Sequence, residues 1–484
     1  MTSRKLLFGI FTIVLVAIIS EPALPQVSAS SSENVSINTN GGVYRWRTSN
    51  GSTDFNIEVR GKIELTDDDR DIKSISDDGY LEINKTVFGS KRTIVIESLG
   101  GGKMKKEYYE GRTKIEWEPN GKEWLSEVLP DIVRSSTIGA ESRVNRFFRQ
   151  GGAAAVLNEI SSLTSDYVKA HYGKLLLEKN ISAADMPKVI TSLSSSISSD
   201  YYLSTLLKDS MKKLLVSKAA ADAFFTASEK ISSDYYRMVV LKEALQEYVT
   251  SPEQVKSILR SAATMSSDYY LSVVLTTVVE NPGAKEETMA DVVEASRNIN
   301  SDYYRTEVLN KALKKSNVTK ETVRNVITAV ANVESDYYKT NVFNSLAERA
   351  AIEPDLQMQV ISLLGSSVSS DYYASVSLSK ILKNQKLSDQ AFESLVETAS
   401  KLSSSTYAAE VLKEASKQEL NNTRVLALLN ASTNLDSEYY LTTVLQSVAP
   451  IVKTGDNILK DAYRKAARSI GSDTYYGKAL KAIE

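Results

Sequence analysis

Carboxylates recur along this chain at a regular interval, and they are the first residues whose type and spacing could carry chemistry. They lie in copies of the motif Ser-Asp-Tyr-Tyr, at Asp166 in a variant copy and at Asp200, Asp234, Asp268, Asp302, Asp336 and Asp371. A retaining glycosidase needs two carboxylates about 5 Å apart. Equivalent residues of stacked repeats lie at least about 8–10 Å apart, the packing distance of neighbouring helices. One carboxylate per repeat therefore favours a structural role, and we predict no catalytic residue.

A serine precedes the acidic position in every copy of the motif, including diverged copies at Ser405, Glu438 and Asp473. Serine is a preferred N-cap because its hydroxyl accepts a backbone N–H that the first helical turn leaves unpaired. An acidic residue just after it lies at the positive end of the helix dipole. We therefore predict that these pairs begin and cap one helix of each repeat. The predicted caps are Ser199, Asp200, Ser233, Asp234, Ser267, Asp268, Ser301, Asp302, Ser335 and Asp336.

The two tyrosines of the motif are predicted to have different surroundings. The second shares a helix face with apolar residues four and eight positions on, and only Val168 replaces it, so we predict that it is buried. The first lies about 100° around the helix and is replaced by Thr406 and Thr474, which favours half-exposure. A row of such rings could contact a peptide or a glycan; alternatively, each ring packs on the neighbouring repeat with its hydroxyl bonded to a loop. The candidate binding residues are Tyr201, Tyr235, Tyr269, Tyr303, Tyr337 and Tyr372.

Other patterns for chemistry are scarce. The single histidine, His171, has no partner motif for zinc, and we predict a surface or groove histidine. The absence of cysteine excludes disulfides and thiolate sites. The acidic run Asp67–Asp71 lacks the spacing of a calcium loop, which predicts a solvated loop. Gly100–Gly102 has no following helix and is not a phosphate loop. We predict no metal and no cofactor.

The motifs belong to a repeat of nearly constant length. Successive acidic positions are separated by 34 residues five times, and then by 35, 34, 33 and 35. Each unit carries two helical patterns, the second introduced by a cap such as Ser251, which Gln254 completes as a capping box, or by Thr319 or Ser388. Two short helices cannot bury their apolar faces alone, so neighbouring units must stack as an α-solenoid.

A different period precedes the repeats. Alternating apolar residues predict a long strand over Phe55–Leu65. Further strands are predicted over Gly79–Ile83, Arg92–Ser98 and Lys105–Trp117, and Asn50-Gly51 predicts a hairpin turn. The fold class is therefore α+β and multidomain, with a small antiparallel β domain of about five to seven strands before the solenoid of about 34-residue repeats.

The N-terminus has the order of a secretory signal. Arg4 and Lys5 precede the apolar run Leu6–Ile19, and Val27-Ser28-Ala29 offers a cleavage site before Ser30; an uncleaved anchor is the alternative. The predicted domains are 1–29, a signal peptide; 30–120, the β domain; 121–163, a helical connector and cap; and 164–484, about nine two-helix repeats plus a terminal half repeat. The predicted location is outside the cytoplasm, either periplasmic or extracellular.

The composition of the chain limits the classes of partner that are expected. Charged residues make up 24% of the chain and nearly balance, at a net charge of −2, which argues against nucleic acid. No stretch after the first segment is apolar enough to predict a membrane span in the mature chain. A protein or peptide partner is expected, with a glycan as the alternative.

The units with "SDYY" followed by "VL" resemble HEAT-type α-solenoid repeats. Together with "GYLEI", "EWLSEVLPDIVRSS" and "GAESRVNRFFRQGGAAAVLNEI", they resemble extracytoplasmic regions of bacterial proteins, some attached to BlaR-type membrane metallopeptidase sensors. The resemblance implies an exported accessory or sensing module, but the chain has no zinc motif of the peptidase. The function predicted is a non-enzymatic scaffold that binds through its repeat surface. The alternative is an envelope enzyme or glycan-binding module using carboxylates or tyrosines of the β domain or concave face.

Overall fold

The computed structural model describes residues 34–40, 43–49, 52–248, 251–281, 285–315, 318–349 and 351–484. The chain forms an N-terminal unit, up to Val156 and again over Ser162–Tyr172, and a repeat unit, made of Leu157–Ser161 and Gly173–Glu484. The predicted signal segment and the Asn50-Gly51 turn lie outside the described residues. Across the described ranges, no helix has the length and apolar character needed to cross a membrane.

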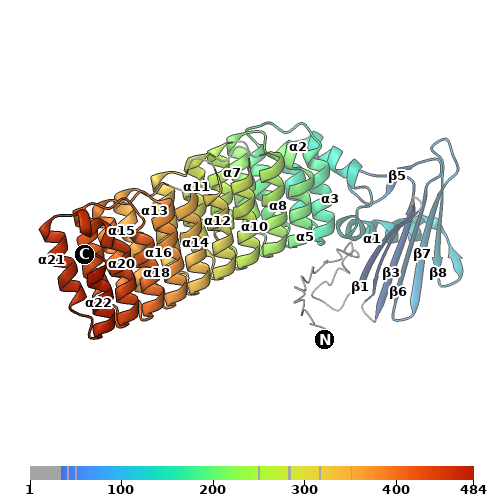
Figure 1. Cartoon of the computed structure of the whole chain (residues 1–484). Helices are drawn as coiled ribbons and strands as arrows, with labels where there is room; N and C mark the ends of the chain where they lie inside the picture. Colours follow the sequence, from blue (N-terminus) through green and yellow to red (C-terminus); the bar gives the residue numbers. More distant parts are fainter. Residues whose placement is uncertain are drawn as a thin grey trace, which may run out of the picture. The chain divides into compact units, whose positions relative to one another are not determined.

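The N-terminal unit is built on an antiparallel sheet of seven strands in the order β1-β2-β3-β6-β7-β8-β9, with a separate hairpin of β4 and β5 (Figure 1). The strands are β1 (Asn34–Asn40), β2 (Val43–Ser49), β3 (Thr53–Arg60), β4 (Ile63–Leu65), β5 (Ile72–Ile75), β6 (Tyr80–Val87), β7 (Ser90–Ser98), β8 (Met104–Glu110) and β9 (Thr113–Ile115). Every pairing is antiparallel. The predicted class of this domain is confirmed.

Two predicted strands are each divided in the structure. The pattern over Phe55–Leu65 becomes β3 and β4, because Gly61 between them has a φ of +76°, in the left-handed region that glycine adopts readily. The segment Lys105–Trp117 becomes the hairpin of β8 and β9, with Gly111 at a φ of +59°. Alternation continues across both turns in the sequence, which explains why the pattern alone predicted single strands.

The core of the N-terminal unit joins one face of the sheet to the helix α1 (Lys122–Ser135). Ile57, Ile83 and Ile94 from the strands and Leu125 and Ile132 from α1 are fully buried in one apolar cluster. The helix therefore belongs to the sheet's core, although it begins the segment that we predicted as a connector. A short helical turn, Trp117–Gly121, precedes it.

We predicted that the acidic run after β4 is a solvated loop, but two of its carboxylates are engaged by other parts of the N-terminal unit. The Asp69 carboxylate forms ion pairs with two buried arginines of α2 (Ala140–Ser162), with N–O distances of 3.0 Å to Arg143 and 2.7 Å to Arg146. Asp71 pairs with Lys106 on β8 at 2.7 Å. These carboxylates attach the loop to α2 and to the sheet. The contacts were not predicted, because the partners lie far along the chain and the local sequence gives no indication of them.

The repeat unit consists of two layers of helices that follow one another in sequence order (Figure 1). The layer that begins with the motif, called the A helices, comprises α5 (Asp200–Asp209), α8 (Asp234–Glu247), α10 (Asp268–Glu280), α12 (Asp302–Leu313), α14 (Asp336–Arg349), α16 (Asp371–Asn384), α18 (Ser405–Ala415), α20 (Glu438–Thr454) and α22 (Asp473–Lys481). The B helices are α4 (Met186–Ser196), α7 (Lys218–Ser228), α9 (Pro252–Ala262), α11 (Glu286–Ala295), α13 (Lys320–Ala331), α15 (Pro354–Ser367), α17 (Asp389–Ser400), α19 (Asn422–Ser432) and α21 (Asn457–Ala467). Other short or shared elements are α3 (Asp166–Leu177), which crosses from one unit to the other, α6 (Met211–Leu214) and the turn Ser296–Asn298.

Each A helix packs on the next A helix, and each B helix on the next B helix, so the predicted solenoid is confirmed. The predicted B-helix caps are also confirmed. Ser251 and Gln254 form the reciprocal capping box, and the hydroxyls of Thr319 and Ser388 accept N–H groups of their first turns. These caps are local, and the sequence therefore predicts them well.

A buried cation three residues after the acidic position joins the two layers in some repeats. The Arg305 guanidinium, 6% exposed, donates to the carbonyl oxygens of Ile299 at 2.9 Å and Asn332 at 2.8 Å. These carbonyls follow the B helices of the preceding repeat and of Arg305's own repeat, at the ends where the helix dipole is negative. Arg237 and Lys339 occupy the same position and also donate to such carbonyls. This role was not predicted, because the carbonyls lie far along the sequence, 27 residues away in the case of Arg305 and Asn332.

Candidate functional site

The acidic residue at the start of each A helix reaches the following repeat. The Asp268 carboxylate accepts hydrogen bonds from the backbone N–H groups of Asn300 at 3.0 Å and Ser301 at 2.7 Å. In other repeats, the two equivalent N–H groups donate to Asp200, Asp234, Asp302, Asp336 and Glu438, and one such group donates to Asp371. We call this contact the carboxylate clamp. It ties each repeat to the turn that begins the next.

The predicted serine–acidic pairs do begin the A helices, with Ser199, Ser233, Ser267 and Ser301 as the N-cap residues, but the predicted hydroxyl bonds are mostly absent. No capping hydrogen bond is made by the hydroxyls of Ser199, Ser233 and Ser301. The Ser267 hydroxyl accepts from the Tyr270 N–H at 3.5 Å, a long distance for such a bond. These serines enter the helix with ψ of 112–119°, against 148–162° at the B-helix caps. The clamp explains this difference in ψ, because it holds the N–H of the serine itself toward the preceding repeat. The Ser335 N–H, for example, donates to the Asp302 carboxylate.

We expect Asp268→Ala to lower the free energy of unfolding by about 2 kcal/mol, the range for hydrogen bonds to a charged group. Two part-exposed N–H groups would lose their acceptor. Chemical denaturation of the purified protein measures the effect. Asp268→Glu is the matched control, because Glu438 forms the same clamp with Gly471 and Ser472, and it should retain most of the stability. Equal losses for the two variants would contradict the clamp.

The tyrosines form a continuous row of rings, which we call the tyrosine ladder. Tyr269 meets Tyr270 of its own repeat at 5.1 Å and Tyr304 of the next repeat at 5.6 Å, measured between ring centroids. The same alternation, with steps of 5.1–6.1 Å, extends from Tyr202 to Tyr407. The rings meet mostly edge to face, a favourable arrangement for aromatic pairs. All of them lie in the first turn of an A helix, so the ladder follows one edge of the stack.

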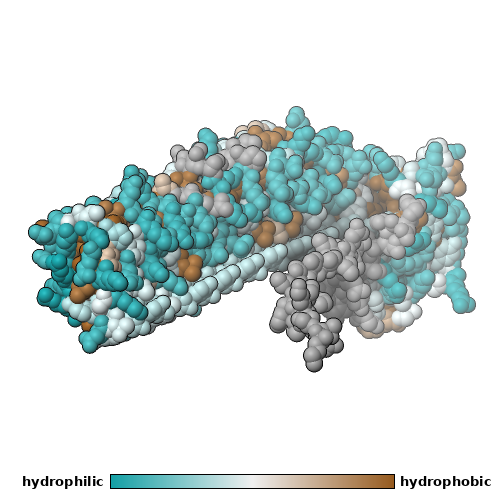
Figure 2. Space-filling model, in the orientation of Figure 1, coloured by the Kyte–Doolittle hydropathy of each residue, from teal (hydrophilic) through white to brown (hydrophobic). Residues whose placement is uncertain are grey.

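Exposure along the ladder differs in part from prediction. The first tyrosines Tyr235, Tyr269, Tyr303, Tyr337 and Tyr372 are 48–52% exposed, as predicted for half-exposed rings, and Tyr201 is less exposed. The second tyrosines, such as Tyr236, are half-buried rather than buried. Their contacts are with other tyrosines at the surface, whereas the core is filled by residues further along the helix such as Val240 and Leu241. Figure 2 shows a straight pale strip along the repeat stack, the colour of residues with near-neutral hydropathy.

The candidate binding residues share a second property. Among the described residues, the hydroxyls of Tyr201, Tyr235, Tyr269, Tyr303, Tyr337 and Tyr372 have no hydrogen-bond partner. Where threonine replaces the first tyrosine, at Thr406, its hydroxyl bonds instead to the Tyr440 hydroxyl at 2.9 Å, and the row resumes through Tyr439 and Tyr475. The loop bond weighed for the first-tyrosine hydroxyl is therefore not found among the described residues.

The arrangement of carboxylates does not favour acid–base catalysis. The acidic residues of the repeats from Asp200 to Glu438 accept the backbone N–H groups of the clamp. On the sheet, Glu107 accepts a hydrogen bond from Lys114 at 2.7 Å, and this ammonium lowers the pKa of Glu107 to about 2. A general acid at neutral pH needs a raised pKa. Among the residues that the structure describes, no cluster of three or more metal-ligating side chains occurs.

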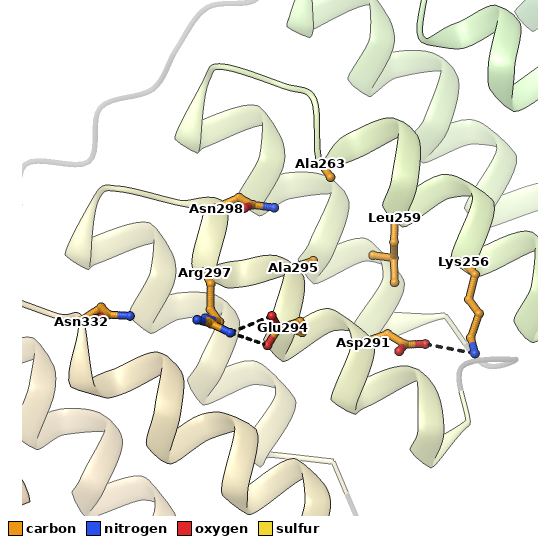
Figure 3. A pocket seen from close by; sticks show the side chains of 9 residues that line it. All are labelled: Lys256, Leu259, Ala263, Asp291, Glu294, Ala295, Arg297, Asn298 and Asn332. Atoms are coloured by element: carbon orange, nitrogen blue, oxygen red, sulfur yellow. Dashed lines mark hydrogen bonds and ion pairs between the residues drawn. The ribbon is translucent and has the colours of Figure 1, made fainter.

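A shallow depression of about 580 Å³ lies along the B helices, between α9 and α11 (Figure 3). Its charged side chains lie in pairs: Lys256 is 3.8 Å from Asp291, and Arg297 is 2.7 Å from Glu294. Because its opposite charges are paired with one another, the depression offers fewer free groups for recognition than the ladder does.

Comparisons with known proteins add little. No family model matches the chain, and no curated protein matches it. A solved structure described as "Computational Design of Self-Assembling Cyclic Protein Homooligomers" aligns with 71% of this chain and 92% of its own, with 14% sequence identity and a TM-score of 0.10. A TM-score this low carries no argument about function.

Proposed function

We propose that the protein is a non-enzymatic scaffold whose tyrosine ladder binds an extended polypeptide. The observation that carries the proposal is the row of first tyrosines, about half exposed from Tyr235 to Tyr372 and each with a hydroxyl that no described residue engages. Tyrosine combines a broad apolar ring with a polar tip and is enriched at binding hot spots. The rings are already fixed by their neighbours, so little side-chain freedom would be lost on binding.

The spacing of the ladder favours an extended chain as the partner. Neighbouring repeats lie about 10 Å apart, and an extended strand rises about 3.3 Å per residue, so one repeat corresponds to about three residues. Peptide carbonyls could accept from the tyrosine hydroxyls, while side chains pack between the rings. Sugar stacking needs open ring faces, but in an edge-to-face row each ring turns toward its neighbour, which favours a polypeptide over a glycan.

The length of the partner provides the test of this proposal. Peptides selected from a random display library on the full chain would be shortened in steps of three residues, and their affinities measured by fluorescence anisotropy. We expect affinity to fall at each step, since each step releases one repeat. Affinity that depends only on a short central segment would contradict binding along the ladder and would indicate a local pocket.

Export is part of the proposal, because the order of charged, apolar and small residues before Ser30 is typical of a secretory signal. In the native host, mass spectrometry should find a mature N-terminus near Ser30, in the periplasm or outside the cell. An intact Met1 on a membrane-bound product would contradict it. The resemblance to extracytoplasmic regions of bacterial sensor proteins agrees with this placement and remains a prediction.

A further inference from the structure

A second pocket lies within the N-terminal unit and has no role in the proposed function. Its volume is about 570 Å³, and its walls are the turn between β3 and β4, the β4–β5 hairpin and the beginning of α2. A pocket of this size suits a small molecule rather than a polypeptide. His171, the single histidine, also lines it, which agrees with the prediction of a groove histidine.

Cations without a protein partner face this pocket from different elements. Arg149 of α2 and Lys73 of β5 both line it and both are exposed, and the side chain of neither makes an ion pair or hydrogen bond with any described residue. Lys62 is 4.0 Å from Glu141, at the limit of an ion pair. Carboxylates are present as well: Glu64, which accepts the Ser74 hydroxyl at 3.2 Å, and Asp67 lie on the hairpin side.

The wall formed by α2 is the side suited to an anion. Gly139, directly before the helix, has a φ of +68°, and the Ala140 and Arg143 N–H groups are bonded to local carbonyls. No acceptor in the described chain is found for the N–H groups of Glu141 and Ser142, which line the pocket at the positive end of the helix dipole.

A buried ion pair holds this wall in place. Arg146 is 7% exposed, and it donates to the Asp69 carboxylate at 2.7 Å and to the Thr66 carbonyl at 2.9 Å. The contact fixes α2 against the loop after β4. Arg149 is one helical turn further along, so its position is set by a rigid element rather than by a loop.

We infer that this pocket binds an oxyanion, the carboxylate or phosphate group of a small polar ligand, through Arg149, Lys73 and the first-turn N–H groups of α2. A guanidinium, an ammonium and helix N-terminal N–H groups are the donors that such groups prefer. The inference concerns a different unit from the tyrosine ladder and does not depend on the ladder's function.

The test is calorimetric titration of the full chain with inorganic phosphate and, separately, with acetate, at constant ionic strength in chloride. Saturable binding of at least one probe is expected, and the tighter probe identifies the oxyanion. The double variant Arg149→Gln with Lys73→Gln should bind at least about tenfold more weakly, because charge-assisted hydrogen bonds are lost.

The matched control is Lys91→Gln with Lys103→Gln, which removes the same charge from exposed positions at the start of β7 and before β8. This control should leave both affinities unchanged. Arg149→Lys alone should retain part of the binding, and melting temperatures check that every variant is folded. No saturable binding of either probe, or an equal loss in the control, would overturn the inference.

Discussion

Replacing Tyr269 and Tyr303 together with serine should weaken the binding of an extended peptide at least about a hundredfold. Tyrosine truncations at hot spots cost about 2 kcal/mol or more each, and each 1.4 kcal/mol is about a factor of ten. The two residues are 49% exposed and occupy the first-tyrosine position of neighbouring repeats. Fluorescence anisotropy with a peptide selected on the unaltered chain measures the loss.

The control for this prediction is the double variant with phenylalanine at both positions, which keeps the rings and removes only the hydroxyls. It should melt like the unaltered protein, because the hydroxyls have no partner in the described chain. If the hydroxyls donate to the partner, it should bind about tenfold more weakly, as for two lost hydrogen bonds of about 0.7 kcal/mol each. Unchanged affinity of the serine variant together with a lowered melting temperature would show that the ladder only stabilises the stack.

Arg305→Ala should lower the free energy of unfolding by about 3 kcal/mol. The substitution removes donors from the carbonyls of Ile299 and Asn332 and leaves a cavity between the two layers. An unpaired buried polar group costs about 1–3 kcal/mol, and the cavity adds to that loss. Urea denaturation followed by circular dichroism measures the change.

The repeat itself supplies the control for Arg305. Leu203 and Leu271 occupy the equivalent position in other repeats and are buried there, so Arg305→Leu should fill the space and cost clearly less than Arg305→Ala. If leucine and alanine were equally destabilising, the loss would come from the hydrogen bonds alone. If neither variant changed stability, the bridging role of the guanidinium would be wrong.

Features that depend on local spacing were predicted well. The near-constant interval between acidic positions gave the solenoid, because stacking is the only way for short helix pairs to bury their faces. The caps at Ser251, Thr319 and Ser388 were also predicted, since a capping bond spans only three residues. The half-exposure of Tyr235 followed from its place on the helix.

Features that depend on contact between repeats were not predicted. The partners of Asp268 lie 32 and 33 residues further on, so its clamp cannot be read from the motif alone. The motif's second tyrosine, as at Tyr236, was expected in the core because it shares a helix face with apolar residues four and eight positions on, yet it packs on the Tyr201 ring at the surface. In the N-terminal unit, Asp69 meets arginines more than 70 residues away.

The most direct measurement of the central claim is hydroxyl-radical footprinting of the protein with and without a selected peptide, read at each tyrosine by mass spectrometry. Binding along the ladder predicts protection of consecutive first tyrosines, such as Tyr235, Tyr269 and Tyr303, at the repeat interval, and no protection of Tyr80 or Tyr109 on the sheet. Protection confined to the N-terminal unit or the B helices, with the ladder tyrosines unchanged, would contradict the claim.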